Sequence, residues 1–127
     1  MARILIVEDS PDNMRLFHAV LGLQGHTVVG LADGSGLIAM LDREPPDLIL
    51  MDIQLPGCDG YTLLDEIRST LHRSIPVIAL TAHAMAGDME RAIEAGFDEY
   101  IRKPIDVRAF PAQIAKVLQR NAGTEIA

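Results

Sequence analysis

Four short apolar runs recur along the chain, and each stops at a polar residue that can take part in chemistry. The runs end at Glu8-Asp9, Asp52, Thr81-Ala82 and Lys103-Pro104. Four or five consecutive apolar residues predict strands that are buried on both faces, as in a parallel sheet. Ligands bind such sheets beyond the carboxyl ends of the strands, so we expect these polar residues to meet at one edge.

Stretches with helical periodicity alternate with these runs, which predicts βα units. The expected strands cover 3–7, 26–31, 47–51, 76–80 and 98–102. The expected helices cover 35–43, 60–70 and 86–95, and two more follow Ser10-Pro11 and Asp106. With right-handed crossovers, this predicts an α/β fold with a doubly wound, five-stranded parallel sheet in the order 2-1-3-4-5. Its switch point lies between the first and third strands, where Glu8, Asp9 and Asp52 would converge.

One domain is expected over residues 2–120, followed by a flexible tail over 121–127. Pro111 conflicts with a last helix that begins directly after Asp106, because proline removes a backbone donor and crowds the preceding turn. The helix is therefore expected to begin nearer Ala109. Periodicity also predicts that Leu71 and Val107 face the core.

The composition bounds the location and the partners. The 127 residues carry a net charge of -7, whereas binding to nucleic acid needs a basic face. No apolar run approaches the ~20 residues of a membrane span, and the first strand begins too early to leave room for a signal peptide. The single cysteine, Cys58, suits a reducing compartment. We therefore expect a cytoplasmic protein that binds neither nucleic acid nor membrane.

The polar residues at the strand ends favour chemistry with a divalent metal and a phosphoryl group. Two carboxylates ~5 Å apart repel by about 3 kcal/mol at an effective dielectric constant of ~20, and a divalent cation removes this penalty. Glu8, Asp9, Asp52 and a backbone carbonyl just beyond Asp52 suit Mg²⁺, with Mn²⁺ as a substitute. The Asp52 carboxylate can also act as a nucleophile on phosphorus, with Lys103 supplying positive charge and the Thr81 hydroxyl donating to a phosphate oxygen.

Four segments together resemble the response-regulator receiver domain of two-component signalling, over residues 2–120. They are ILIVED (4–9), LILMDIQLPGCDG (48–60), PVIALTA (76–82) and YIRKP (100–104). The resemblance implies a flavodoxin-like (βα)5 fold of the CheY type. Residues 13–17, 24–25 and 81–88 are similar to single-domain, DivK-like cell-cycle regulators, and also to receivers attached to hybrid histidine kinases. Glu8 replaces the commoner aspartate and differs from it in length alone.

The resemblance implies a role for each site residue. Asp52 would accept a phosphoryl group from a partner's phosphohistidine, while Glu8, Asp9, Asp52 and the main-chain carbonyl of Gln54 would hold Mg²⁺. The catalytic and switch residues would be Thr81, Ala82, Lys103 and Tyr100, and Tyr100 would change rotamer when the threonine moves. Gln54 and His83 would tune dephosphorylation, and Pro104 is a candidate for a cis peptide bond.

The main hypothesis is a stand-alone phospho-switch. It would not be an enzyme but a signalling phospho-acceptor that assists its own phosphorylation and its slow autodephosphorylation. Its donor would be a histidine kinase or a histidine phosphotransfer protein, and its target a downstream kinase or another effector. A monomer or a weak dimer is expected. A receiver cut from a hybrid histidine kinase remains an alternative.

Another alternative is a Mg²⁺-dependent phosphatase with an aspartyl nucleophile. Such enzymes usually carry an acid two residues after the nucleophile, as general acid. Here that position is Gln54, which cannot play this role.

A nominal dinucleotide fingerprint over 34–39 leaves Glu8, Thr81 and Lys103 unexplained, and is read as a turn that begins a helix. The four histidines lack the spacing of zinc ligands.

Overall fold

The computed structural model describes residues 2–55, 57, 59–82 and 85–126, the last six by their backbone alone. Strands and helices alternate strictly along the chain. They are β1 (Arg3–Val7), α1 (Pro11–Leu23), β2 (Thr27–Leu31), α2 (Leu37–Arg43), β3 (Leu48–Asp52), α3 (Gly60–Arg68), β4 (Val77–Thr81), α4 (Asp88–Ala95), β5 (Glu99–Arg102) and α5 (Phe110–Ile126).

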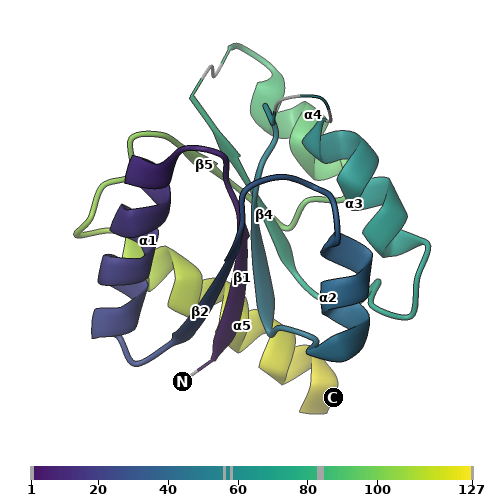
Figure 1. Ribbon diagram of the computed structural model, residues 1–127, viewed down its shortest axis with the longest axis horizontal. Coiled ribbons are helices and arrows are strands. Elements are labelled where there is room, and N and C mark those ends of the chain that lie inside the picture. Colours follow the sequence, from purple (N-terminus) through teal and green to yellow (C-terminus); the bar gives the residue numbers. More distant parts are fainter. Residues whose placement is uncertain (1, 56, 58, 83–84, 127) are drawn as a thin grey trace.

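The five strands form one parallel sheet in the order β2-β1-β3-β4-β5, which confirms the predicted topology. Helices α1 and α5 cover one face, and α2, α3 and α4 cover the other (Figure 1). The core is accordingly split by the sheet. Phe17 of α1 and Phe110 of α5 belong to one buried cluster, whereas Leu41 of α2, Leu64 of α3 and Ala92 of α4 belong to the second.

The first helix shows how local sequence sets an element's boundary. The Ser10 side chain accepts a hydrogen bond from the main-chain N–H of Asn13 at 3.3 Å, and Pro11 occupies the first helical position. A serine oxygen satisfies a donor that the helix itself leaves free, and proline loses nothing there because its nitrogen carries no hydrogen. Both features match the start signal read from the sequence.

The fifth helix begins at Phe110, so Pro111 lies in its first turn, where a missing N–H is harmless. This agrees with the expectation of a start near Ala109 rather than directly after Asp106. The helix continues to Ile126. The chain is therefore helical beyond residue 120, where a tail was expected to begin.

The prediction that Leu71 and Val107 face the core was wrong. Leu71 is 92% exposed and Val107 is 49% exposed. Helix α3 ends at Arg68 and α5 begins at Phe110, so both residues lie in connecting segments where helical periodicity no longer applies. Among the residues that the structure describes, no helix combines the length and apolar character needed to cross a bilayer.

Candidate functional site

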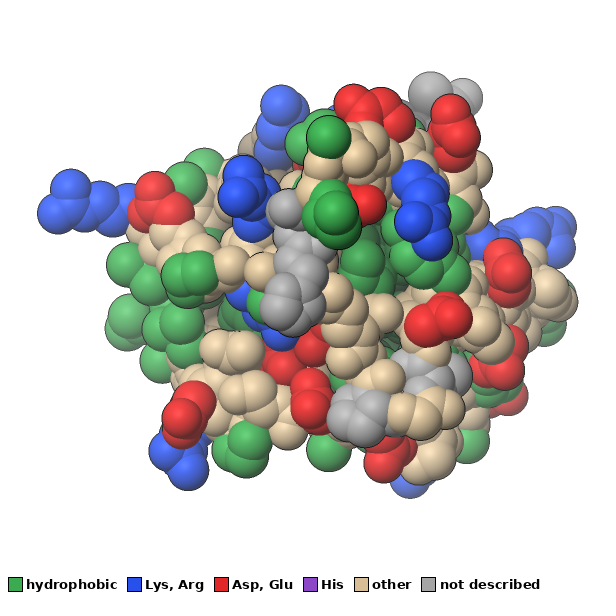
Figure 2. Space-filling view, turned by 90° about the horizontal axis from the view of Figure 1, so that it is seen from above, with side chains coloured by type: hydrophobic (Ala, Val, Ile, Leu, Met, Phe, Trp, Pro, Cys, Tyr) green, Lys and Arg blue, Asp and Glu red, His purple; other side chains and the backbone are tan. Residues whose placement is uncertain are grey.

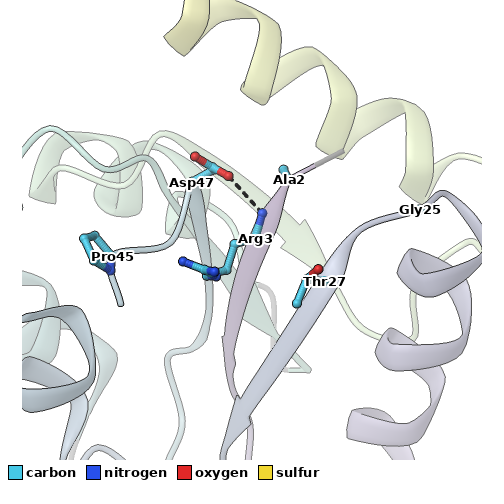
Figure 3. A pocket seen from close by; sticks show the side chains of 6 residues that line it. All are labelled: Ala2, Arg3, Gly25, Thr27, Pro45 and Asp47. Carbon is cyan, nitrogen blue, oxygen red and sulfur yellow. Dashed lines mark hydrogen bonds between the residues drawn. The ribbon is translucent and has the colours of Figure 1, made fainter. Parts of the chain in front are cut away.

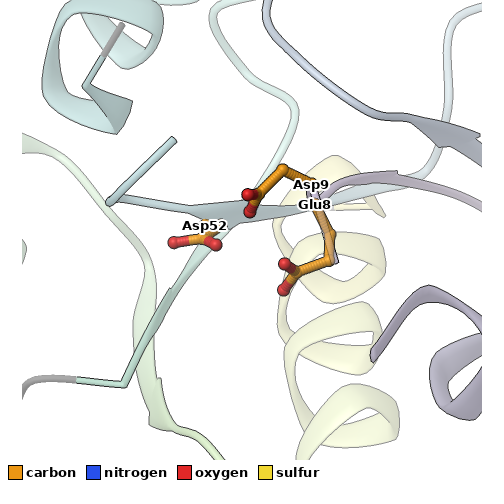
Figure 4. Close-up of side chains that lie close together, drawn as sticks. All are labelled: Glu8, Asp9 and Asp52. Atoms are coloured by element: carbon orange, nitrogen blue, oxygen red, sulfur yellow. The ribbon is translucent and has the colours of Figure 1, made fainter. Parts of the chain in front are cut away.

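Three carboxylates converge at the carboxyl edge of the sheet. Strands β1 and β3 pair with Val7 opposite Met51, which places the residues that follow them side by side. Glu8, Asp9 and Asp52 each offer an oxygen within 4.8 Å of the other two (Figure 4). Glu8 and Asp52 are buried, at 1% and 3% exposure, and Asp9 is exposed. Figure 2 looks down on this edge and shows acidic side chains gathered near the middle of the face.

Lys103 joins two of these carboxylates. Its ammonium nitrogen lies 2.9 Å from Glu8 Oε1 and 3.0 Å from Asp52 Oδ2. The lysine follows β5, and its main-chain N–H donates to the carbonyl of Thr81 at 2.7 Å, which fixes where its side chain starts. The sequence predicted Lys103 at this edge but not its bond to Glu8, which lies 95 positions away.

The second oxygen of each buried carboxylate accepts a main-chain N–H. Asp52 Oδ1 accepts from Gln54 at 2.8 Å, and Glu8 Oε2 accepts from Ser10 at 3.1 Å. Buried carboxylates need such partners because burial removes the water that would otherwise solvate them. Both side chains are thus held in fixed orientations, with neighbouring oxygens turned toward Lys103.

Burial and pairing shift the pKa values of two of these groups. Burial raises the pKa of Glu8 above its usual value, and hydrogen bonds from Lys103 and Ser10 offset part of that rise. Burial by itself would lower the pKa of Lys103, but its hydrogen bonds and charge interactions with Glu8 and Asp52 together raise it. Lys103 is therefore a cation at neutral pH. With all three carboxylates ionised, the cluster keeps two net negative charges (-3 + 1), which suits a divalent cation.

Thr81 and Ala82 bring hydrogen-bonding groups to the same edge. Thr81 is the last residue of β4 and is 1% exposed. The main-chain N–H of Ala82 donates to the side-chain oxygen of Gln54 at 3.3 Å. This bond links the segment after β3 to the segment after β4. Sequence reasoning missed it, because no local pattern marks a contact between residues 28 positions apart.

Tyr100 lies on β5 opposite Ala79 and is 7% exposed. Within the described part of the chain, its hydroxyl has no hydrogen-bond partner of good geometry, although it lies near enough to Thr81 for the two side chains to interact electrostatically. Burial raises the pKa of the Tyr100 phenol.

The Lys103–Pro104 peptide bond is cis, as the sequence suggested. His83 and Cys58 lie outside the described residues.

A separate hollow of about 390 Å³ lies at the opposite edge of the sheet (Figure 3). It is lined by Ala2, Arg3, Gly25, Thr27, Pro45 and Asp47. The Arg3 main-chain N–H bonds the Asp47 carboxylate there at 2.8 Å. Because β1 begins at Arg3 and Glu8 follows its other end, the hollow is a full strand away from the three carboxylates.

Comparison with known proteins identifies the family. The model of the response regulator receiver domain matches residues 4–115. The chain belongs to this family. It is 40% identical to the polar-differentiation response regulator DivK of Brucella ovis, covering 91% of this chain and 94% of DivK. It is 36% identical to the sensor histidine kinase GacS of Pseudomonas protegens, covering 97% of this chain but 14% of the kinase. Receivers of this kind thus occur both as nearly whole proteins and as small parts of long ones.

Solved structures of receiver domains have the same fold as this chain. The receiver domain of the Pseudomonas aeruginosa sensor histidine kinase PA1611 is 40% identical, with a TM-score of 0.80, covering 96% of this chain and 98% of that one. That structure has a magnesium ion coordinated in its active site cleft. A CheY-like receiver from Methanospirillum hungatei has a TM-score of 0.88 at 28% identity, covering 98% of each chain. The acidic cluster of Glu8, Asp9 and Asp52 fits the receiver Mg²⁺ site. The phosphatase alternative is not favoured.

Proposed function

We propose that this receiver is a phospho-switch in which Asp52 accepts the phosphoryl group. The observation that supports this most is the environment of Asp52. Its carboxylate is buried at the end of β3, beside Glu8, and Lys103 bonds both carboxylates. A carboxylate held in this way is oriented for attack, and a cation beside it stabilises the negative charge of the incoming group.

The proposed reaction is a phosphoryl transfer from a phosphohistidine. A carboxylate oxygen of Asp52 forms the new bond to phosphorus, the phosphorus–nitrogen bond of the donor breaks, and the imidazole leaves with the electron pair. The main-chain N–H of Gln54 and the ammonium of Lys103 orient the Asp52 carboxylate beforehand. The Thr81 hydroxyl, the Ala82 N–H and Lys103 then donate to the oxygens of the phosphoryl group.

The metal ligands in this proposal are Glu8, Asp9, Asp52 and the main-chain carbonyl of Gln54. The three carboxylates and the Lys103 ammonium together carry two net negative charges. The carboxylates therefore form a donor set that suits Mg²⁺, with Mn²⁺ as a substitute. When bound, the ion neutralises the repulsion between the carboxylates and the phosphoryl oxygens.

Phosphorylation would act on the rest of the molecule through Thr81 and Tyr100. It adds about -1.5 to -2 charge and strong hydrogen-bond acceptors at Asp52. We propose that these draw in Thr81, and that Tyr100, whose buried hydroxyl lacks a well-placed partner among the described residues, turns into the vacated space. This would alter the surface formed by α4, β5 and α5. Gln54 and His83 would tune the lifetime of the phosphoryl group.

The proposed donors are a histidine kinase or a histidine phosphotransfer protein, and the proposed target is a downstream kinase or another effector. The 94% coverage of DivK supports a stand-alone regulator, whereas the likeness to GacS supports a module within a larger kinase, and we propose the former. A cytoplasmic monomer or weak dimer that binds neither nucleic acid nor membrane remains the prediction.

The direct test is phosphorylation with acetyl phosphate and Mg²⁺, followed by intact mass measurement. The wild type should gain one phosphoryl group, and Asp52→Asn should gain none. Asp65→Asn makes the same chemical change on the exposed side of α3 and should behave as the wild type. Full stoichiometric phosphorylation of Asp52→Asn would refute the assignment.

A further inference from the structure

The side chain of Gln54 accepts a hydrogen bond from the main-chain N–H that is proposed above to bind the phosphoryl group. Gln54 Oε1 accepts the main-chain N–H of Ala82 at 3.3 Å. Ala82 directly follows Thr81, so its N–H lies at the same edge of the sheet as the Asp52 carboxylate. Gln54 follows Asp52 by two positions, and its own N–H holds Asp52 Oδ1 at 2.8 Å. One residue thus contacts both the proposed acceptor and the proposed phosphoryl-binding amide.

We propose that the Gln54 side chain is a resting-state competitor for the Ala82 N–H, which the phosphoryl group must displace before it can bind there. The inference rests on the proposed function, since it assumes that a phosphoryl group forms on Asp52. A single N–H makes one well-aligned hydrogen bond, so the Gln54 amide oxygen and a phosphoryl oxygen cannot both hold it at full strength. The side chain therefore specifically lowers the affinity of the site for a phosphoryl group.

The size of the effect follows from the exposure of the bond. Gln54 and Ala82 are both exposed, and 3.3 Å is long for an N–H···O bond. Water competes for both groups, so the net strength of such a bond is near the lower end for hydrogen bonds in proteins. Its removal is expected to strengthen binding of a phosphoryl analogue by about twofold to fivefold. The competitor thus weakens the active state slightly and does not block it.

The geometry separates this role from the rest of the site. The bond to Asp52 is made by the main chain of Gln54, and a side-chain substitution leaves it in place. The proposed metal ligand at this residue is likewise its main-chain carbonyl. Gln54→Met keeps the length of the side chain but removes the amide oxygen. Gln113→Met makes the same change at an exposed position on α5 and is the matched control.

The experiment measures the affinity for beryllofluoride, a phosphoryl analogue, at a fixed saturating Mg²⁺ concentration. Gln54→Met should bind it twofold to fivefold more tightly than the wild type, and Gln113→Met should match the wild type. In the metal-free proteins, the Ala82 amide proton resonance should move in Gln54→Met but stay in place in Gln113→Met. With beryllofluoride bound, the Ala82 resonance of Gln54→Met should lie close to that of the bound wild type, because the analogue then holds the N–H in both proteins.

The outcomes distinguish the two proposals. If the wild type does not bind beryllofluoride, the proposed function fails and this inference fails with it. If the wild type binds but Gln54→Met binds equally or more weakly, the inference alone is overturned. An Ala82 resonance that does not respond to Gln54→Met in the metal-free protein would also overturn it. Circular dichroism of each variant shows that the fold is retained, as expected for an exposed side chain.

Discussion

Replacing Lys103 by methionine removes the cation that pairs with two buried carboxylates. The ammonium nitrogen lies 2.9 Å from Glu8 Oε1 and 3.0 Å from Asp52 Oδ2. The three side chains are 11%, 0% and 4% exposed, so water replaces little of what the lysine supplies. Methionine keeps much of the length and apolar stem of lysine but carries no charge. The variant thus leaves Glu8 and Asp52 facing each other without a counterion.

The magnitude follows from charge separation and burial. Oxygens of Glu8 and Asp52 lie within 4.8 Å of each other, and two unit charges at that distance repel by about 3 kcal/mol at an effective dielectric constant of ~20. Removal of one partner from a buried ion pair costs about 3–5 kcal/mol in measured cases. We expect Lys103→Met to lower the free energy of unfolding by about 3 kcal/mol without metal, since water can enter beside exposed Asp9. That is a large share of the ~5–15 kcal/mol typical of a domain.

Urea unfolding with a chelator, and again with Mg²⁺, measures this loss. Because Lys103 repels a cation held by the same carboxylates, Mg²⁺ should stabilise Lys103→Met more than the wild type and reduce the deficit. The chain's other lysine, Lys116, lies on the exposed side of α5. The free energy of unfolding of Lys116→Met should stay within about 0.5 kcal/mol of the wild-type value. A loss below about 1 kcal/mol in the chelator, or equal stabilisation of both proteins by Mg²⁺, would refute the electrostatic reasoning.

Three further predictions concern stability. A Cβ added at Gly60 would lie 2.7 Å from the Cα of Ile53, so Gly60→Ala should lower the free energy of unfolding by about 1–3 kcal/mol in urea. Gly22→Ala, with nothing within 4 Å, should not destabilise the protein, and equal effects of the two would contradict this account. Arg68 donates to three carbonyls and to the Asp98 carboxylate, so we expect Arg68→Met to cost about 2–3 kcal/mol in the same assay and exposed Arg73→Met almost nothing. Burial lowers the pKa of His26 below its usual 6.5, so the folded state binds fewer protons there than the unfolded state. Its contribution is full above pH ~6.5 and is lost as the pH falls through the lowered pKa, and His26→Gln should weaken the acid-side fall in thermal stability. An unchanged pH profile would contradict that sign.

Most of the fold was predictable because its strands are buried on both faces. In β1, β3 and β4 burial makes nearly every position apolar, so the strands stand out as continuous runs that end abruptly at a polar residue. The predicted ends of the strands were less accurate than their positions along the chain. The run before Asp52 predicted a strand over 47–51, whereas the sheet includes Asp52 itself, because the ladder depends on backbone pairing and Asp52 pairs with Leu80.

Helix ends were predicted well only where a strong local signal exists. Ser10-Pro11 marked the start of α1 correctly. The end of α3 was placed too late, and Leu71 was wrongly assigned to the core. The hydroxyls of Ser69 and Thr70 donate to the carbonyls of Asp65 and Ile67, at 2.8 and 2.7 Å, where the helix ends. Such side-chain bonds compete with continued helix, and hydrophobic periodicity does not detect them.

The amino-acid sequence by itself determined the alternation of strands and helices, and it placed a reactive residue at the end of each central strand. Apolar burial and chain chirality are general enough to convert those patterns into a sheet order and a single functional edge. Only the tertiary structure decided which side chains bond one another at that edge. Lys103 pairs with Glu8 across 95 positions, and Gln54 meets Ala82 across 28. These partners are set by strand order, strand pairing and the exact end of each strand, and no local pattern in the chain encodes such distances.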